Sequence, residues 1–361
     1  MLRHALNASL YLGGLALFWH LVRSSGVGSE LNFEFSPVLA LLLLAVSTLP
    51  SYFDAKAWQV TAAGLGAGAK KIPLAPLIWL RIAGEGVTNG VPGGLVFGET
   101  YKAVKLNEWF AARPSDTTPG LILMKLGLGY SQALFILMGM ALGYSRIAAE
   151  SEVAFGFAGV QWIVLALLVA MCAFMGIALV LFYLGRPFAR VISVLNLLPQ
   201  KSVKEWVERQ QLKVKTLDEN CSALIKGHPR ELLMIMFWLM MRWFSMVGEN
   251  LIILAGLQLL PSSPLDALLV AFVIESLGSM FRLIFFLVPS GIGGQDASYF
   301  ALFQLYGWSA PITGAYIVVK RLKELFWIAA GFVLIFVTRF FSVQLSDATA
   351  LPEEELERTS P

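Results

Sequence analysis

The chain has 361 residues, of which 57% are hydrophobic and 14% are charged, and its formal net charge is +3. Soluble domains contain about 25% charged residues, so this composition argues against a soluble domain and indicates a multispanning membrane protein. Two cysteines, Cys172 and Cys221, are too few for a disulfide framework or a metal site. We therefore expect an all-α fold, a polytopic bundle of transmembrane helices.

Long apolar runs predict the membrane spans in chain order. A bilayer core about 30 Å thick requires about 20 apolar residues per helix. The runs that meet this requirement lie at about 5–22, 36–53, 118–144, 160–184, 231–258 and 312–341. The first follows a basic start, but no small-x-small cleavage site comes after Val22, so we expect a retained helix. Residues 1–345 then form a single transmembrane domain, and 346–361 form a polar disordered tail.

Two further apolar regions, about 74–106 and 265–308, are interrupted by glycine and proline. Loops rich in Lys and Arg stay in the cytoplasm, so the basic residues set the orientation. The cytoplasmic set then holds 16 Lys and Arg and comprises the N-terminus, 54–73, 101–117 and 185–230. Arg23 and Arg146 fall in the opposite loops. Each interrupted region must begin and end on one face, which predicts two re-entrant hairpins entering an inner membrane from opposite sides, with both termini cytoplasmic.

The two interruptions resemble each other in sequence. VPGGLVFGE at 91–99 can be laid over VPSGIGGQD at 288–296, a shift of 197 residues. The matched turn residues are Pro92 with Pro289, Gly94 with Gly291 and Glu99 with Asp296, and Gly294 belongs to the same second turn. The identity hardly extends beyond the turns, so a chance match stays open beside a true repeat. A repeat of inverted topology places substrate sites near the midplane of many transporters.

Residues 202–226 predict an amphipathic cytoplasmic helix, because their apolar residues recur at a three-four spacing. Its basic residues suit the anionic cytoplasmic leaflet. A loop helix that packs on the bundle is the other interpretation, and the two are compatible.

Many ionisable residues fall inside the predicted spans and hairpins. Such groups usually face a bundle interior or a cavity, where they mark pathways or find partners. The set comprises Arg81, Glu85, Glu99, Lys125, Arg242, Glu249, Glu275, Arg282, Asp296, Lys320, Arg321, Lys323 and Glu324. Irregular backbone at membrane depth also requires surrounding protein or a water-filled cavity. The sequence therefore predicts paired charges around a polar cavity between the two hairpins.

The most concentrated charges lie in IVVKRLKELFW at 317–327. Lys320 and Glu324 are four residues apart and can pair along one face, though in the less favourable order, whereas Arg321 lies about 100° round the helix. An anionic ligand such as a lipid phosphate would complete the charge balance, and Arg suits phosphate. The alternative is a salt-bridge network that only ties helices together.

Glu85 and Arg282 each precede the proline of their turn by seven residues, which predicts an ion pair across the pseudo-symmetry axis. Arg242 is assigned to the same cavity. Signals for other chemistry are weak, because GLGAGAKK at 64–71 lacks the spacing of a phosphate loop and the three histidines lack metal-ligand spacing. We therefore expect no catalytic residues, no cofactor, no metal and no nucleic-acid partner.

Asn89 followed by VPGGLVFGETYKAVKL, and later VPSGIGGQDASYF with YIVVKRLKELFWIAAG, resembles the integral membrane family of the lysylphosphatidylglycerol synthase transmembrane region. That family includes the flippase domain of the multiple peptide resistance factor, and stand-alone proteins of which some are associated with hopanoid biosynthesis. The resemblance covers about 5–341. Asp296 stands where Glu is commoner, and Gln295 where a basic or small residue is frequent. Only a short tail follows Phe341, so we expect no aminoacyl transfer to lipid.

The main hypothesis is a flippase-like transporter that moves an amphipathic or anionic lipid between leaflets. The head group would meet Lys320, Arg321, Arg282 and Arg242. The cavity and its turns would use Glu85, Asn89, Pro92, Gly94, Glu99, Pro289, Gly291, Gly294, Asp296 and Glu324. The alternatives are a non-transporting partner or scaffold of a lipid-modifying or hopanoid-type biosynthetic enzyme, and a membrane-embedded enzyme. Membrane lipids are the expected partners, and the sequence leaves the oligomeric state open.

Overall fold

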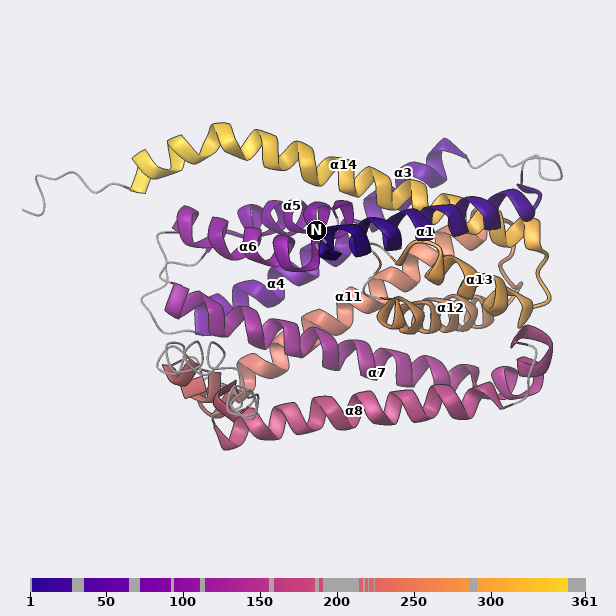
Figure 1. The fold of residues 1–361 in the computed structure, drawn as a ribbon, viewed down its shortest axis with the longest axis horizontal. Helices are drawn as coiled ribbons and strands as arrows, with labels where there is room; N and C mark the ends of the chain where they lie inside the picture. The colour runs from indigo at the N-terminus through magenta and orange to yellow at the C-terminus, as the bar shows by residue number, and fades with distance from the viewer. Residues whose placement is uncertain are drawn as a thin grey trace, which may run out of the picture.

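The structure, a computed structural model, describes residues 2–27, 36–64, 72–91, 94–110, 114–155, 159–185, 188–190, 214–216, 218–219, 221–223, 225–285, 288 and 291–349. Within these ranges the chain is helical with short turns and contains no strand, which confirms the expected all-α class. The helices are α1 (Leu2–Ser24), α3 (Pro37–Val46), α4 (Leu49–Gly64), α5 (Leu74–Gly90), α6 (Gly94–Phe110), α7 (Pro114–Phe155), α8 (Val160–Leu184), α11 (Pro229–Gly256), α12 (Pro264–Ile284), α13 (Gly294–Gln304) and α14 (Ala310–Thr349) (Figure 1).

The protein is a multi-pass membrane protein. Among the described residues, five helical stretches are long and apolar enough to cross a bilayer: Pro37–Thr61, Gly120–Glu152, Val160–Leu181, Pro229–Gly256 and Pro264–Ile284. The first four coincide with predicted spans, and the fifth lies inside the interrupted region 265–308. The remaining predicted spans are also helical, 5–22 within α1 and 312–341 within α14.

α14 is a long helix that carries Lys320, Arg321, Lys323 and Glu324. It has 40 residues, so at 1.5 Å per residue it is about 60 Å long, about twice the thickness of a bilayer core. It continues through Thr349, past the predicted end of the transmembrane domain at residue 345. Residues 350–361 of the predicted tail and most of the predicted amphipathic helix 202–226 lie outside the described residues.

The first long span is broken between α3 and α4. The hydroxyl of Ser47 donates to the carbonyl oxygen of Leu44 (2.9 Å), and that of Thr48 to Ala45 (2.7 Å). Such side-chain bonds compete with the backbone ladder and bend helices. α4 then continues to Gly64 and carries Asp54, which is 1% exposed, so the first part of the predicted cytoplasmic segment 54–73 is helical and packs inside the bundle.

Two antiparallel helix pairs occupy opposite ends of the molecule in Figure 1, with α5 packed on α6 and α12 on α13. α12 begins at Ser263, whose hydroxyl accepts from the backbone N–H of Asp266 (3.4 Å), with Pro264 at the first helical position. α11 and α14 run between the pairs. α11 contacts both α4 and α12, and α14 contacts both α5 and α13.

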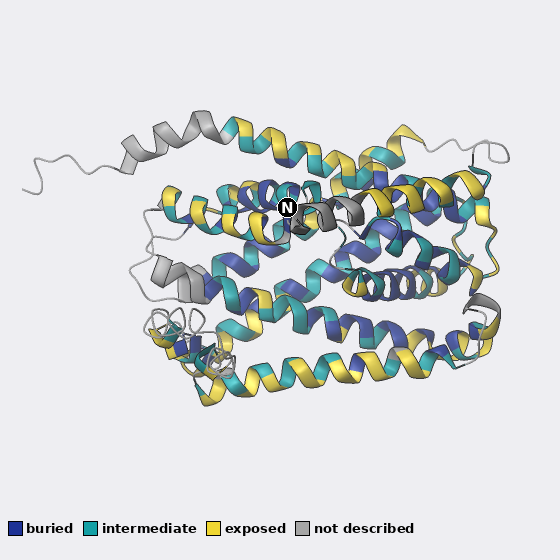
Figure 2. Ribbon diagram, viewed as in Figure 1, coloured by how far each residue is buried: buried dark blue, intermediate teal, exposed yellow. Residues whose placement is uncertain are grey.

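The outer surface of the bundle is apolar. α8 packs on α7 but exposes most of its length, as the yellow segments of Figure 2 show. Its exposed residues include Trp162, Phe174 and Ile177, which are 60%, 71% and 60% exposed. A helix that is apolar all round and exposed belongs in lipid rather than water. The charged residues gather instead in the interior.

Candidate functional site

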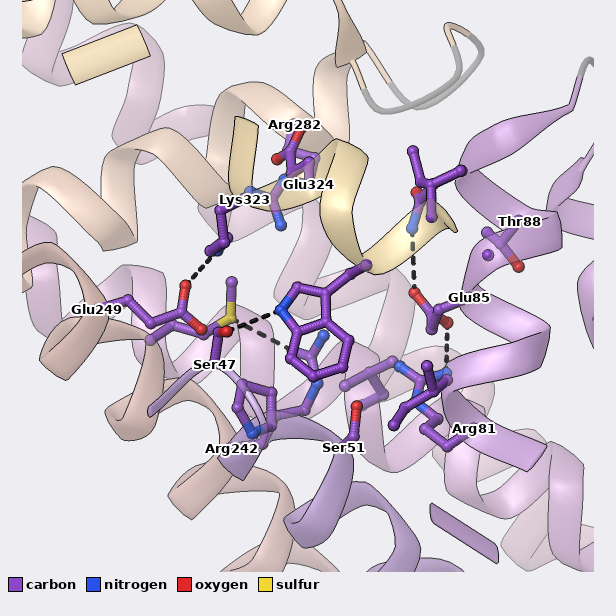
Figure 3. A pocket seen from close by; sticks show the side chains of 18 of the residues that line it. Ser47, Ser51, Arg81, Glu85, Thr88, Arg242, Glu249, Arg282, Lys323 and Glu324 are labelled. Carbon is purple, nitrogen blue, oxygen red and sulfur yellow. Dashed lines mark hydrogen bonds and ion pairs between the residues drawn. The ribbon is translucent and has the colours of Figure 1, made fainter. Parts of the chain in front are cut away.

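A cavity of about 350 Å³ lies between the C-terminal ends of α5 and α12, one helix from each pair. The last turn of α5 and the last turn of α12 both line it, together with the α3–α4 break, α7, α11 and α14. Figure 3 shows Arg81 and Arg242 on one side of it, and Arg282, Lys323 and Glu324 on the other. The ionisable lining residues are Arg81, Glu85, Lys125, Arg242, Glu249, Arg282, Lys323 and Glu324.

One buried carboxylate holds two of the lining arginines. Oδ2 of Asp54 accepts from Nε of Arg81 (2.7 Å) and from Nε of Arg242 (3.0 Å). The three residues come from α4, α5 and α11, so the contact joins three helices. Arg242 also lies over the ring of Trp243, with its guanidinium carbon 4.4 Å from the ring centroid.

Glu85 and Glu99 continue this charge network toward α6 and α7. Glu85 pairs with Arg81 on its own helix, and Lys102 lies 3.7 Å from it. Glu99 accepts from Lys102 and pairs with Lys125, both at 2.5 Å. Asn89, one turn beyond Glu85, donates to Glu85 (3.4 Å). The predicted pair of Glu85 with Arg282 is therefore replaced by local pairs, because cations on α5 and α6 lie closer to Glu85.

α14 supplies the opposite wall through two further pairs. Lys323 pairs with Glu249 of α11, and Figure 3 draws this contact as a dashed line. Glu324 accepts from Arg321 (2.5 Å), one turn earlier on α14. The spacing on α14 allows Lys320 to pair with Glu324, but the structure pairs Lys320 with Glu275 of α12 instead.

Lys320 lies in a buried polar network behind the cavity. Its ammonium group donates to Glu275 of α12 (2.9 Å) and to the hydroxyl of Tyr299 (3.0 Å). Asn250 donates to Glu275 (2.8 Å) and accepts from Tyr316 (2.7 Å). Every polar group here has a partner, as a buried network requires. Lys320 is 3% exposed and does not line the cavity, so its contact with a ligand stays a prediction.

Arg321 holds the second turn together. Its guanidinium donates to Oδ1 of Asp296 from Nε (2.9 Å) and from Nη2 (2.7 Å). The other oxygen of Asp296 accepts from the backbone N–H of Gly293 (2.8 Å), at the N-terminus of α13. This acidic residue thus satisfies an N–H that a helix start leaves unpaired. Arg321 as a ligand contact also stays a prediction.

Arg282 differs from the other lining cations, because its hydrogen-bond partner in the structure is a neutral side chain. Its guanidinium donates to Gln295 of α13, at 3.4 Å from Nε, and among the described residues no carboxylate lies within ion-pair distance of it, so Glu275 and Glu324 act on it only at longer range. In either orientation of its amide, the oxygen of Gln295 accepts from Arg282. Gln295 is 1% exposed and is fixed by Tyr299 at 3.0 Å. Arg282 and Arg242, both predicted from sequence, do line the cavity.

Glycines permit the close contacts that the turns require. A Cβ on Gly94 would lie 2.2 Å from the carbonyl oxygen of Val87, so the start of α6 fits against α5 only without a side chain. Gly291 and Gly293 have φ of 61° and 83°, a region that favours glycine. A Cβ on Gly294 would meet the ring of Phe285 at 2.6 Å. Pro92 and Pro289, the matched prolines, lie outside the described residues.

Two residues essential to this geometry were not singled out from the sequence. Asp54 follows an apolar run, and Lys102 follows the first turn, so both were assigned to cytoplasmic segments. Asp54 is 1% exposed and Lys102 is 3% exposed. A signal that could have found Asp54 is the excess of basic over acidic residues in the predicted spans, which implies a further carboxylate nearby, whereas no signal in the sequence marks Lys102. Within the described residues, no three His, Cys, Asp or Glu side chains are arranged to hold a metal ion.

A comparison with models of protein families matches residues 8–331 to the family described as the lysylphosphatidylglycerol synthase TM region. No curated protein and no solved structure matches the chain.

Proposed function

The chain belongs to the family of the lysylphosphatidylglycerol synthase transmembrane region, and on this premise we propose that it is a flippase-like transporter. It moves an amphipathic or anionic lipid between the leaflets of the cell inner membrane. The observation that carries the proposal is a charged cavity of about 350 Å³ enclosed by apolar, lipid-facing helices.

The size of the cavity suits part of a lipid. Ligand pockets in proteins run from about 300 to 1,000 Å³, so this one is at the small end of that range. It accommodates a polar head group, while the acyl chains stay in the bilayer. Charged residues remove the main barrier to flipping, which is the transfer of a charged head group through hydrocarbon.

The two helix pairs are proposed to be re-entrant hairpins of an inverted repeat. α5 and α6 have 17 residues each and α13 has 11, so at 1.5 Å per residue they are about 26 Å and about 16 Å long. Each is shorter than a bilayer core of about 30 Å, whereas α12, with 21 residues and a length of about 32 Å, is long enough to cross it. In support of this proposal, one helix of each pair, α5 and α12, lines the same cavity, as expected for a substrate site near the midplane of an inverted repeat. In the proposed orientation both termini are cytoplasmic.

The proposed step is an exchange of partners without covalent chemistry. A head-group anion meets Arg282 directly and competes with the carboxylates that pair with Arg81, Arg242 and Lys323, and it leaves when those pairs form again. The protein is thus not proposed to be an enzyme. Membrane lipids are its proposed partners. Transport is proposed to be driven by a gradient, by the membrane potential or by mass action.

The test is lipid movement by the purified protein in liposomes. Acyl-labelled fluorescent phosphatidylglycerol is placed in both leaflets, and dithionite then quenches the outer leaflet. Protein-containing liposomes should lose more than half of their fluorescence, whereas empty liposomes stop at about half. A matched pair of variants at a lining position sharpens the test. Leu283→Trp fills the cavity and should slow the loss, while Leu283→Met conserves volume and should not.

Unchanged lipid asymmetry with folded protein would contradict transport. It would favour the alternative of a scaffold for a lipid-modifying or hopanoid-type biosynthetic enzyme.

A further inference from the structure

The charged network around the cavity has one more cation than it has carboxylates. Counted over the described residues that line the cavity or pair with its lining and turns, the cations are Arg81, Lys102, Lys125, Arg242, Arg282, Lys320, Arg321 and Lys323. The carboxylates are Asp54, Glu85, Glu99, Glu249, Glu275, Asp296 and Glu324. Eight positive charges therefore face seven negative charges.

The extra positive charge can be assigned to Arg282. Each of the other seven cations has a carboxylate oxygen within 4.0 Å, whereas Arg282 has the neutral Gln295 as its hydrogen-bond partner. Arg282 occupies the last turn of α12, where the helix end carries about half a negative elementary charge. That partial charge reduces the surplus without removing it. The guanidinium faces the cavity, so its charge is available to a ligand.

We infer that the cavity selects a head group with a single net negative charge, a phosphodiester lipid, and discriminates against a cationic, aminoacylated head group. This inference rests on the proposed function for its transport consequences. A phosphodiester monoanion would neutralise the surplus, and Arg suits phosphate oxygens because its planar fork makes two parallel hydrogen bonds. A zwitterionic head group leaves the surplus in place, and a cationic one doubles it.

The other residues that line the cavity also favour a phosphodiester head group. Lys323 and Arg242 also line the cavity, so a phosphate can be met from α11, α12 and α14. The carboxylates that could attract an ammonium group are each already held. Glu249 pairs with Lys323, Glu324 pairs with Arg321, and Glu85 pairs with Arg81.

The experiment compares three lipids that differ in head-group charge and carry the same label on an acyl chain. They are phosphatidylglycerol (−1), phosphatidylcholine (0) and ethylphosphatidylcholine (+1). Transport is measured in liposomes by dithionite quenching, and binding is measured separately by native mass spectrometry on equimolar mixtures. We expect the transport rate and the binding affinity of phosphatidylglycerol to exceed those of phosphatidylcholine by about tenfold. One charge-assisted hydrogen bond is enough for a difference of this size. The cationic lipid should come last.

Variants at position 282 connect the preference to one side chain. Arg282→Gln removes the surplus, so the two leading lipids should become about equal, and Arg282→Lys should retain the preference. The control is Lys215→Gln, which removes an exposed cation, 54% exposed, away from the cavity and should change nothing. If Arg282→Gln does not fold, the comparison of the three lipids on the wild-type protein still tests the inference. Equal binding of the three lipids, or an unchanged preference in folded Arg282→Gln, would overturn the inference.

The two proposals fail in different ways. Movement of all three lipids at equal rates would leave transport standing and overturn the selectivity. Preferential binding of phosphatidylglycerol with no movement of any lipid would leave the selectivity standing and overturn transport. Soluble glycerol 3-phosphate offers the same phosphate chemistry without acyl chains. If an equimolar amount of glycerol 3-phosphate displaced phosphatidylglycerol, the site would be assigned to a soluble anion. The inference that its ligand is a lipid would then be wrong.

Discussion

Asp54 shows how one buried carboxylate organises several helices. It is 1% exposed and accepts from Arg81 and Arg242, while its second oxygen, Oδ1, has no hydrogen-bond partner among the described residues. Burying an ionised carboxylate is expensive unless its partners are held in good geometry. Two arginines on neighbouring helices supply that geometry here. The positions of both arginines in the cavity wall therefore depend on Asp54.

We predict that Asp54→Asn destabilises the protein strongly. Removing one member of a buried ion pair leaves its partner uncompensated, at a cost of about 3 kcal/mol in the free energy of unfolding. Here that partner is Arg242, since Arg81 keeps its pair with Glu85. Thermal unfolding of the detergent-solubilised protein measures this effect. The control is Glu219→Gln, which removes a carboxylate that is 60% exposed and pairs with Lys215 at 3.9 Å. An equal and small shift for both variants would contradict the organising role of Asp54.

At the scale of elements, the contact between α5 and α14 is a close helix crossing beside the cavity. It depends on two glycines that face each other. A Cβ on Gly331 would lie 2.7 Å from the carbonyl oxygen of Ile82 and 2.8 Å from Cα of Gly86. A Cβ on Gly86 would lie 2.9 Å from Cα of Gly331. The neighbouring atoms are backbone and cannot rotate away, so any side chain must push the helices apart.

Gly331→Ala is therefore predicted to destabilise the protein and to displace the cavity wall, since Trp327 and Ile328 lie one turn away on α14. Gly176→Ala is the control, because nothing lies within 4 Å of a Cβ there and alanine favours helix by about 1 kcal/mol. The melting temperature should fall for the first variant and stay or rise for the second. A rise for both would contradict the close crossing.

The two turns also differ in ways that their sequence match does not predict. Asp296 is the third residue of α13 and caps its N-terminus, whereas Glu99 is the sixth residue of α6 and meets Lys102 and Lys125. α13 starts at Gly294, three residues after Gly291, the residue matched with the start of α6 at Gly94. Matching acidic residues thus perform different tasks, one in the backbone of a turn and one in the charge network.

At the scale of the whole molecule, the proposed hairpins predict that the inner ends of α5 and α12 share one environment. Asn89→Cys and Leu283→Cys place thiols at two lining positions from the two pairs. A membrane-impermeant thiol reagent should label both slowly, from either face, and phosphatidylglycerol should slow both further. Rapid labelling of both from one face only would mean that the turns are aqueous loops, and the re-entrant arrangement would then be wrong.

The natural cysteines set the background of this experiment. Cys221 is fully buried, and burial raises the pKa of its thiol to about 12, so the reactive thiolate is scarce at neutral pH. Cys172 is only partly buried and should be replaced by Ala.

The sequence by itself determined the class of the protein and most of its charged interior. Long apolar runs require lipid or a large core, so composition and periodicity were enough to predict helices that cross a membrane. A charge inside such a run is expensive, which is why the positions of Arg81, Glu85, Arg242 and Arg282 along the chain predict a polar interior, and the structure then places all four in the cavity wall. The family also follows from sequence, because it matches residues 8–331.

Only the tertiary structure decided which charges meet. Glu85 pairs with Arg81 rather than Arg282, and Lys320 meets Glu275 of α12 rather than Glu324 on its own helix. Spacing along one helix cannot predict such pairs, because a carboxylate from another helix can approach more closely than one in the next turn. The same packing put Asp54 inside the bundle and left Arg282 facing the cavity with a neutral partner. The charge of the site is therefore a property of the assembled bundle.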